Sequence, residues 1–296
     1  MNGVLIIDKP HGMTSHDVVN RVRKITGEKS IGHLGTLDPM ATGVLPLLLG
    51  KFTRLAQYFS SDEKSYSGSI RFGFATDTYD AEGHPAGADR WSEVCEVITI
   101  ERIRELAASF LGESNQMPPP YSAKKIDGTP AYRLAREGKP VELKPARVRI
   151  SLLEVGGLNG AEVSFTMRIS AGGYVRSVAH ELGTMMGCGA HLSALRRTQA
   201  GGFALDLAIP LGELQEAAGN REALEALFVH PRNLLPEMPA VVGDAHALNR
   251  IRNGGHVNLS EFSDASLVKV FAGQRELIAI AKRIGGTLFQ PVVVMG

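Results

Sequence analysis

The 296-residue sequence has little of what marks several common protein classes. Its 2 cysteines, Cys95 and Cys188, exclude a disulfide framework of the secreted kind, and neither has the spacing of a metal or redox motif. The 9 histidines are scattered, so we expect no metal site. No apolar run is long enough to cross a bilayer, and the N-terminus lacks the basic start of a signal peptide. These absences predict a soluble, cytoplasmic protein.

The sequence also has almost no excess of charge of one sign, since its formal net charge is +1. The distribution is nevertheless uneven. Positions 124–149 hold eight basic residues against three acidic ones, and Lys124, Lys125 and Arg133 are among the basic ones. A second basic group lies at positions 21–29. Clustered cations favour a surface for a polyanion such as RNA, although a solvated helix face has the same composition.

Residues 32–43, Gly-His-Leu-Gly-Thr-Leu-Asp-Pro-Met-Ala-Thr-Gly, form the most informative segment. Its glycines let the backbone approach a ligand closely, and Pro39 biases Asp38 toward an extended conformation. The loop therefore presents one carboxylate in a fixed orientation, which suits a catalytic or phosphate-contacting acid. Asp-Pro is also an ordinary turn former. The loop lacks both the Gly-Lys-Ser/Thr and the Gly-x-Gly-x-x-Gly pattern of nucleotide-phosphate loops.

Hydrophobic periodicity predicts an α+β fold, because strands and helices alternate without a regular βαβ rhythm. We expect a mixed, largely antiparallel central sheet with flanking helices. The predicted strands are 3–8, 45–49, 64–73, 148–155, 162–170 and 192–197, with a long turn at 156–160. The predicted helices are 14–25, 53–59, 99–111, 130–138 and 174–186.

The chain is predicted to form two domains, 1–238 and 239–296. Within the first, at about residues 115–147, a proline-rich extended arm precedes a basic helix. Prolines between 231 and 239 indicate a linker. Segments 267–272, 276–284 and 287–295 then predict a small β-rich domain.

Three separated stretches are informative in combination. They are the loop at 32–43, Lys64-Ser65-Tyr66 on the strand that follows, and Gly173-Tyr174-Val175-Arg176-Ser177 at a helix start. Together with Asp8-Lys9-Pro10, residues 120–124 and Leu195-Arg196-Arg197, they resemble the TruB-type tRNA pseudouridine-55 synthases. The resemblance covers residues 3–197 and implies a pseudouridine synthase fold. It continues weakly into the C-terminal domain, which resembles PUA-like RNA-binding modules. Leu34 departs from the threonine or other small residue that many members carry.

The resemblance implies isomerisation of uridine to pseudouridine at position 55 in the T-loop of tRNA. The N1–C1′ bond breaks, the uracil turns, and C5 is joined to C1′; no group enters or leaves, so no cofactor is expected. Asp38 matches the family nucleophile, whose attack on C1′ or on the base stays open. Arg176 matches its ion-pair partner. Tyr66 matches a tyrosine that packs on the uracil and could relay a proton.

The same resemblance implies that the target base is flipped out of the T-loop, with His33 filling the vacated space or supporting the everted loop. Lys9, Tyr174 and Leu195 resemble pocket or loop-supporting residues of the family and are counted with the RNA-binding positions. The basic stretch that includes Lys124, Lys125 and Arg133 matches an insertion that closes over the T-arm stem-loop.

Other functions fit parts of the sequence. A non-catalytic RNA-binding or tRNA-folding module would need only the basic arm and the β-rich domain. A guide-RNA-dependent, dyskerin-type relative would need protein partners. Because the first predicted strand begins at Gly3, we expect instead a stand-alone monomer with no obligatory protein partner and no membrane association. A phosphate-binding hydrolase is a remote alternative.

Overall fold

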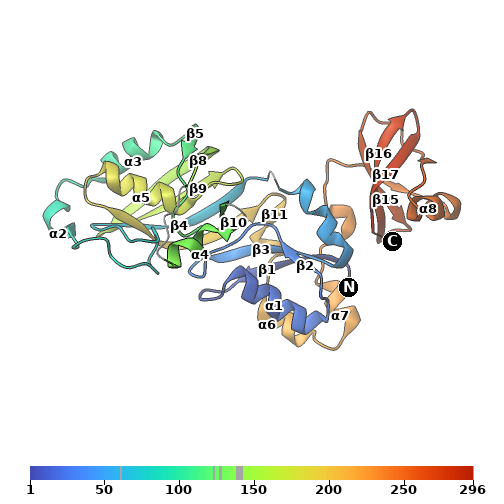
Figure 1. Ribbon diagram of the computed structural model, residues 1–296, viewed down its shortest axis with the longest axis horizontal. Helices are drawn as coiled ribbons and strands as arrows, with labels where there is room; N and C mark the ends of the chain where they lie inside the picture. The colour runs from blue at the N-terminus through green and yellow to red at the C-terminus, as the bar shows by residue number, and fades with distance from the viewer. Residues whose placement is uncertain (61, 123, 127–128, 138–142, 296) are drawn as a thin grey trace.

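The computed structural model describes residues 1–60, 62–122, 124–126, 129–137 and 143–295. A ten-stranded sheet dominates it, with strand order β12–β1–β3–β10–β4–β9–β8–β5, β2 beside β3 and β11 beside β10 (Figure 1). The β1–β12 and β3–β10 pairs are parallel and the other pairs are antiparallel. The predicted mixed, largely antiparallel sheet is confirmed. Its strands are β1 (Gly3–Lys9), β2 (Ile31–His33), β3 (Thr42–Leu49), β4 (Lys64–Phe72), β5 (Gly112–Gln116), β8 (Ala146–Asn159), β9 (Glu162–Ile169), β10 (Ala190–Ala200), β11 (Phe203–Ala204) and β12 (Ile209–Pro210).

Helices cover the sheet at two places. α3 (Ile100–Ala108) and α5 (Val175–Met185) pack on the half formed by β4, β8, β9 and β10, and α1 (Ser15–Thr26) packs beside β2 and α6 (Leu211–Glu216). The segment predicted as a helix at 53–59 is a 3₁₀ helix, η1 (Gly50–Tyr58). None of the helices within the described ranges is long and apolar enough to span a membrane. Besides η1, the helices of this part are α1 (Ser15–Thr26), α2 (Trp91–Val94), α3 (Ile100–Ala108), α5 (Val175–Met185), η2 (Leu205–Leu207), α6 (Leu211–Glu216), α7 (Arg221–Ala226) and η3 (Pro231–Asn233).

Helix α1 shows how local sequence fixes an element beside the candidate site. Thr14 and Asp17 form a reciprocal capping box, in which each side chain accepts a hydrogen bond from the other residue's backbone N–H. Gly27 ends the helix with a left-handed backbone, φ 70°. Between these ends Val18 and Val22 lie one turn apart and are fully buried. The helix therefore holds the segment 8–15 against the sheet.

Strands β4 and β9 alternate between a buried face and an open face. Tyr66 and Ile70 of β4, with Val163 and Phe165 of β9, belong to the core under α3 and α5. The intervening serines and threonines face the other way, as expected for an antiparallel sheet solvated on one side.

The hairpin between β8 and β9 differs from its prediction. Residues 156–160 were expected to form a long turn, but β8 continues to Asn159 and the turn follows at Gly160 and Ala161. The pairing register shifts between Val155 and Leu158. The two glycines at 156 and 157 are thus accommodated as an irregularity inside the strand, as is common for glycine in a sheet.

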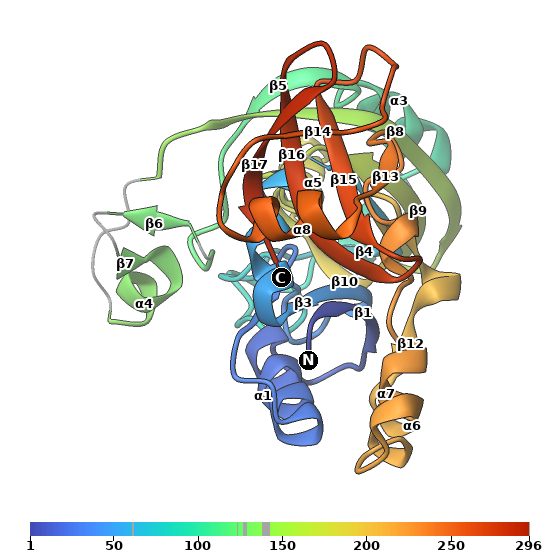
Figure 2. The same cartoon turned by 90° about the vertical axis from the view of Figure 1, so that its right-hand side faces the viewer.

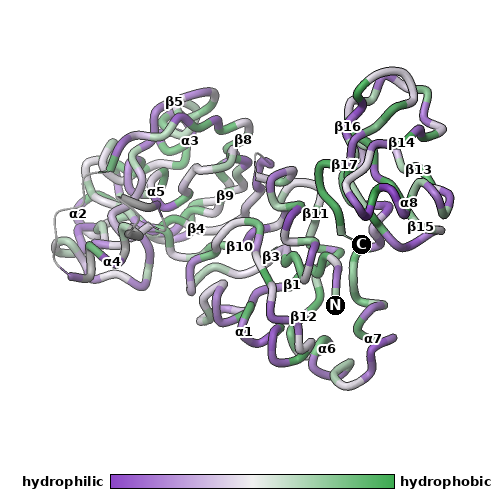
Figure 3. The backbone as a smooth tube through the Cα atoms, turned by 45° about the vertical axis from the view of Figure 1, so that its right-hand side comes forward, coloured by the Kyte–Doolittle hydropathy of each residue, from purple (hydrophilic) through white to green (hydrophobic). Residues whose placement is uncertain are grey.

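A second sheet, of order β13–β15–β16–β17–β14, forms the predicted β-rich C-terminal part (Figure 1). Strand β17 is one of the more hydrophobic segments of the chain (Figure 3). Phe271, Ile280 and Val293 of this part join Ile6 and Leu48 of the main sheet in one buried cluster. The two sheets therefore share a core, while the division at 238/239 stays a prediction. Its elements are β13 (Ala240–Val242), α8 (Ala245–Arg252), β14 (Val257–Asn258), β15 (Leu267–Ala272), β16 (Glu276–Gly285) and β17 (Leu288–Val294).

In the basic arm, residues 117–145, the described strands β6 (Lys125–Ile126) and β7 (Thr129–Pro130) and the helix α4 (Ala131–Arg136) lie to one side of both sheets (Figure 2). Strands β6 and β7 pair only with each other, and α4 follows them. Helix α4 lies within the predicted basic helix. Positions 123, 127–128 and 138–142 of the predicted insertion lie outside the described residues.

Candidate active site

Asp38 and Arg176 lie 138 positions apart in sequence and form a two-point ion pair. Asp38 is in the loop of residues 34–41 between β2 and β3, which we name the catalytic loop after the role predicted for Asp38. Arg176 is the second residue of α5. Arg176 Nε lies 2.8 Å from Asp38 Oδ2, and Arg176 Nη2 donates to Asp38 Oδ1 at 3.1 Å. The Arg176 side chain is 5% exposed and that of Asp38 is 34% exposed. The guanidinium therefore fixes the carboxylate while leaving it within reach of a ligand.

Arg176 is itself oriented by three other groups. Its Nη1 donates to the Thr78 carbonyl at 2.9 Å, and its Nη2 donates to the Tyr121 carbonyl at 3.0 Å. Asp80 Oδ2 lies 3.4 Å from Nη1, and the Asp80 side chain is 4% exposed. Arg176 thus joins two carboxylates, of which the sequence had pointed only to Asp38. Asp80 sits in a loop with no motif of its own, so pattern alone gave no signal for it.

Burial and neighbouring charges act on Asp38 in opposite directions. Burial raises the pKa of the Asp38 carboxyl, and the nearby Asp80 carboxylate raises it further. The Arg176 guanidinium and the Lys9 ammonium oppose this rise in pKa. The net pKa stays above the ordinary range of an Asp, so the positive charges decide how much of Asp38 is ionised near neutral pH.

Lys9 binds backbone carbonyls of the catalytic loop and of the segment after β1. It is completely buried, and its Nζ donates to the carbonyls of Pro39 at 3.1 Å, Met13 at 2.5 Å and Pro10 at 2.9 Å. Burial lowers the pKa of Lys9 to about 8. Lys9 was predicted among the RNA-binding positions. In the structure its ammonium binds backbone carbonyls of and beside the loop, and its role toward RNA stays a prediction.

Arg197 and Ser15 hold the same loop from other sides. Arg197 is 1% exposed, and it donates to the carbonyls of Val44 at 2.7 Å and Gly35 at 3.1 Å. The Ser15 hydroxyl accepts from the Leu37 N–H at 2.8 Å and donates to the Leu37 carbonyl at 3.1 Å. Sequence reasoning assigned neither residue a role, because each acts on a backbone far away in the chain. The loop is therefore held on both sides of Asp38 before any substrate binds.

Tyr66 and Leu195 are brought together on one face of the sheet. Tyr66 is opposite Arg197 and Leu195 is opposite Gly68, so Tyr66 and Leu195 are diagonal neighbours across β4 and β10. Their residues are 9% and 8% exposed, respectively. This position suits apolar walls of a pocket, and the proposed roles of both residues stay predictions.

His33 ends β2, opposite Leu47 of β3. Its Nδ1 is buried and has no hydrogen-bond partner among the described residues. Burial and the Arg197 charge lower the pKa of His33, which favours the neutral imidazole. A neutral ring next to the catalytic loop fits the predicted space-filling role, which is likewise still a prediction.

The start of the basic arm is hydrogen-bonded to the N-terminus of α5, the helix that carries Arg176. The Gln116 side chain accepts from the Tyr174 N–H at 2.8 Å and donates to the Tyr174 carbonyl at 3.0 Å. The Ser177 hydroxyl donates to the Met117 carbonyl at 2.7 Å. Together with the Tyr121 carbonyl on the guanidinium, these bonds connect the arm directly to Arg176 and its neighbours.

The three basic positions predicted in the arm differ in what can be said of them. Arg133 is exposed on α4. Lys124 is half-buried, and its Nζ donates to the Lys144 carbonyl at 2.7 Å. The side chain of Lys125 lies outside the described residues. At least one predicted cation is therefore open to a phosphate, and RNA contact by all three remains a prediction.

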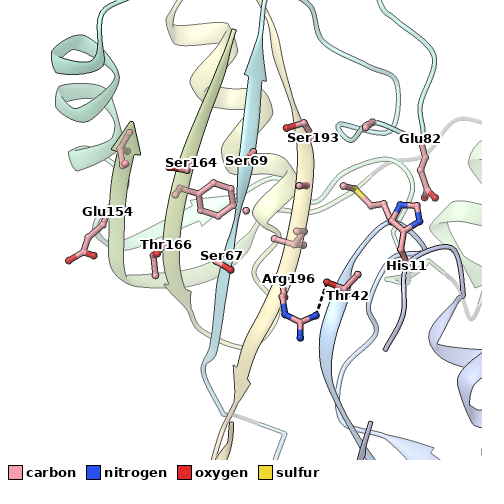
Figure 4. A pocket seen from close by; sticks show the side chains of 18 residues that line it. His11, Thr42, Ser67, Ser69, Glu82, Glu154, Ser164, Thr166, Ser193 and Arg196 are labelled. Atoms are coloured by element: carbon pink, nitrogen blue, oxygen red, sulfur yellow. Dashed lines mark hydrogen bonds between the residues drawn. The ribbon is translucent and has the colours of Figure 1, made fainter. Parts of the chain in front are cut away.

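A groove of about 1000 Å³ lies next to the catalytic loop on the open face of the sheet (Figure 4). Hydroxyl side chains of the strands line its floor, and His11 and Glu82 lie at one end. Arg196 borders it, donating to Thr42 at 3.3 Å and pairing with Asp8 at 2.7 Å. Asp38 is not among its lining residues, but Met40 of the same loop is. The hydroxyl lining residues are Thr42, Ser67, Ser69, Ser164, Thr166 and Ser193.

Family models match most of the chain. Residues 23–175 match the N-terminal domain of the TruB family of pseudouridylate synthases, and residues 176–235 match the C-terminal domain of tRNA pseudouridylate synthase B. The chain belongs to the TruB family. The predicted family, reaction class and pseudouridine synthase fold are thereby confirmed.

Individual relatives agree with this assignment. A tRNA pseudouridine synthase B of Solibacter usitatus is 44% identical over 100% of both chains. That of Aquifex aeolicus is 37% identical, over 97% of this chain and 98% of the relative. The fold is similar to the crystal structure of the archaeal box H/ACA sRNP Nop10–Cbf5 complex, with TM-score 0.68 and 23% identity over 99% of this chain and 86% of that one.

Proposed function

We propose that this TruB-family enzyme converts uridine 55 in the T-loop of tRNA to pseudouridine, with Asp38 starting the cleavage of the N1–C1′ bond. The observation that carries the proposal is the Asp38–Arg176 pair, in which a buried guanidinium holds a carboxylate that is still 34% exposed. The names of the relatives, tRNA pseudouridine synthase B, support tRNA as the substrate.

The geometry supports a division of labour around the everted uridine. Asp38 supplies the negative charge, either to C1′ as the N1–C1′ bond breaks or to the base itself. Arg176 keeps that charge oriented, because two of its N–H groups bind the two carboxylate oxygens. Asp80 and the Thr78 carbonyl keep the guanidinium from turning. A nucleophile held in this way needs little reorganisation when the substrate arrives.

Tyr66 and Leu195 are proposed to bind the uracil between the two bond changes. Their adjacent positions on β4 and β10 would form an apolar wall against which the freed base can turn before C5 meets C1′. The Tyr66 phenol is the proposed group that relays the C5 proton. His33 is proposed to fill the space left in the T-loop, and the resulting stacking offsets the cost of extruding the base.

The basic arm is proposed to close on the T-arm. Arg133 is exposed on α4, and the start of the arm is bonded to Tyr174, Arg176 and Ser177. Binding of phosphates by the arm would therefore act on the helix that carries Arg176. Such contacts position the RNA, while the shape of the loop and its splayed bases specify it. We propose that the enzyme acts alone, as a cytoplasmic monomer.

The test is conversion of an unmodified tRNA transcript by the purified protein, without added cofactor, followed by mapping of pseudouridine. The expected result is one modified position, uridine 55, and no product from a transcript with cytidine at that position. Asp38→Asn should abolish turnover and keep RNA binding, because the replacement has nearly the same shape. A protein that binds tRNA equally well with and without Asp38 and never forms pseudouridine would instead be a non-catalytic tRNA-folding module.

A further inference from the structure

Tyr79 has a backbone conformation that non-glycine residues rarely adopt. Its φ is 67°, and the only other described non-glycine residue with positive φ is Leu235. Tyr79 lies between Thr78 and Asp80, the two residues of its loop that bind Arg176. Strained backbone of this kind persists only where surrounding contacts hold it, and it concentrates at functional sites.

The contact that holds Tyr79 comes from the helix that carries Arg176. The rings of Tyr79 and His180 are stacked, with centroids 3.7 Å apart and planes 10° apart. His180 is four residues after Arg176, so both side chains project from one face of α5. Burial lowers the pKa of His180, which keeps the stacked imidazole neutral. The stack therefore adds no charge beside the guanidinium.

The left-handed turn at Tyr79 directs its neighbours toward one point. The Thr78 carbonyl reaches Arg176 Nη1 at 2.9 Å, and Asp80 Oδ2 lies 3.4 Å from the same nitrogen. The Thr78 hydroxyl also donates to Asp80 Oδ1 at 2.7 Å. If Tyr79 relaxed to the ordinary right-handed or extended region, the peptide groups on either side would rotate, and the two acceptors could not both face Arg176.

We propose that Tyr79 and His180 form a positioning pair: their stacking holds the left-handed turn that aims the Thr78 carbonyl and the Asp80 carboxylate at Arg176, and so fixes Arg176 on Asp38. Neither ring is proposed to touch the substrate. The inference rests on the proposed role of Asp38, and it adds two residues that the family motifs in this sequence do not include.

The test is a double-mutant cycle of Tyr79→Ala, His180→Ala and the double variant, with single-turnover rates measured on the tRNA transcript from acid to neutral pH. Each single change should lower the rate about tenfold with the KM for tRNA nearly unchanged, because a loosened Arg176 disturbs the chemistry and not the binding. The double variant should be no slower than either single one, since both changes remove the same stack.

The pH dependence of the single-turnover rate distinguishes a positioning role from simple loss of structure, which would not shift the acid limb of the profile. Arg176 lowers the pKa of Asp38, so a less fixed guanidinium should shift the acid limb of the profile to higher pH in all three variants. The other groups that act on Asp38 keep their chemical identity in these variants, and of these only Asp80 is positioned by the Tyr79 turn. These are Asp80 in the loop, Lys9 on β1, Glu82 and Tyr174.

Tyr79→Phe and His180→Phe are the matched controls, since each keeps an aromatic ring in the stack. Both should retain the wild-type rate and acid limb. Additive losses in the cycle, or a loss confined to KM with an unmoved acid limb, would overturn the pairing in favour of separate packing or RNA contacts. Thermal unfolding of every variant identifies any that fails to fold.

A measurement independent of turnover separates this proposal from the proposed function. The carboxyl of Asp38 can be titrated by NMR in ¹³C-labelled protein, with Asp38→Asn to assign the signal. Tyr79→Ala and His180→Ala should raise its pKa by the same amount, and the two Phe variants should leave it in place. Absence of pseudouridine in the wild type would refute the proposed function, whereas an unmoved Asp38 pKa in both Ala variants would refute the positioning pair.

Discussion

The catalytic loop and the basic arm are two irregular segments that meet at Arg176, and they are held in opposite ways. Loop backbone groups at Gly35, Leu37 and Pro39 are bound by buried side chains from β1, α1 and β10. The arm carries its own two-stranded sheet, touches α5 at its start and extends away from the main body (Figure 2). Chemistry needs a fixed carboxylate, whereas an RNA clamp needs exposed charge, and the proposed function divides these two tasks between the two segments.

The largest expected effect comes from removing the cation that both segments share. Arg176→Met leaves Asp38 and the buried Asp80 without their common partner, which should lower the free energy of unfolding by about 3 kcal/mol, the low end for a broken buried pair because Asp38 is partly exposed. Urea unfolding at pH 7 measures this. The loss should shrink in acid, since each carboxyl, once protonated, no longer needs the guanidinium.

Arg221→Met is the matched control for this change. Arg221 pairs with Glu225 on α7, but its side chain is 82% exposed, so the loss should stay within about 0.5 kcal/mol. Equal losses for the two variants would contradict the view that Arg176 is a buried anchor.

The next largest effect is expected from adding a methyl group at Gly43, in the part of β3 that follows the catalytic loop. Gly43 has φ +97°, and a Cβ built on it would lie 2.2 Å from the Arg197 carbonyl oxygen. Gly43→Ala should therefore destabilise the protein by about 2 kcal/mol, seen as a lower midpoint of thermal unfolding. Gly202→Ala is the control, because its Cβ would meet nothing within 4 Å. A shift no larger at Gly43 than at Gly202 would show that β3 and β10 can separate freely.

A smaller effect should appear in the pH dependence of the loop. Burial lowers the pKa of Lys9 to about 8 in the folded protein. Above that pH the native state binds fewer protons than the unfolded chain, so stability should rise until the ordinary lysine pKa is reached. A neutral amine has only two N–H donors for three carbonyls, so turnover should fall over the same range.

Parallel pH titrations of turnover and of urea unfolding check this opposed pair of trends. Lys9→Arg, whose guanidinium stays charged, should remove both. Stability and turnover that move together in the wild type would assign the transition to another group.

The smallest effect is expected from removing one cation of the basic arm. Arg133→Ala should weaken tRNA binding at low salt and reduce the slope of log affinity against log salt by about 1 if the residue contacts one phosphate. Filter binding across a salt series measures the slope, and turnover at saturating tRNA should be unchanged. Arg221→Ala on the distant α7 is the control. A loss of saturated turnover without a change in slope would place Arg133 with the catalytic loop and not with the RNA clamp.

Sequence reasoning succeeded where a feature is local. The helix predicted at 14–25 is α1 (Ser15–Thr26), and the alternation around Tyr66 predicted the strand 64–73, which is β4 (Lys64–Phe72). It failed at 156–160, where glycines were taken as a turn although the strand continues through them as an irregularity. Glycine permits both conformations, and the partner strand decided between them.

The site shows the same limit. The resemblance supplied Asp38 and Arg176, and the structure places them in contact. Asp80 and Ser15 were missed, because each is an ordinary residue type outside any spacing that predicts chemistry. Arg197 belongs to the stretch Leu195-Arg196-Arg197 that supports the resemblance, but the sequence assigned it no role.

The amino-acid sequence by itself determined the class of fold, the family and the carboxylate on which the proposed chemistry depends, because periodicity and short motifs are written in neighbouring residues. Only the tertiary structure decided what surrounds that carboxylate. Arg176 arrives from 138 positions away, Asp80 approaches from a loop between them, and Lys9 and Arg197 are buried against backbone carbonyls. Contacts of this kind depend on which strands become neighbours, and burial then shifts the pKa of the charged groups that meet there.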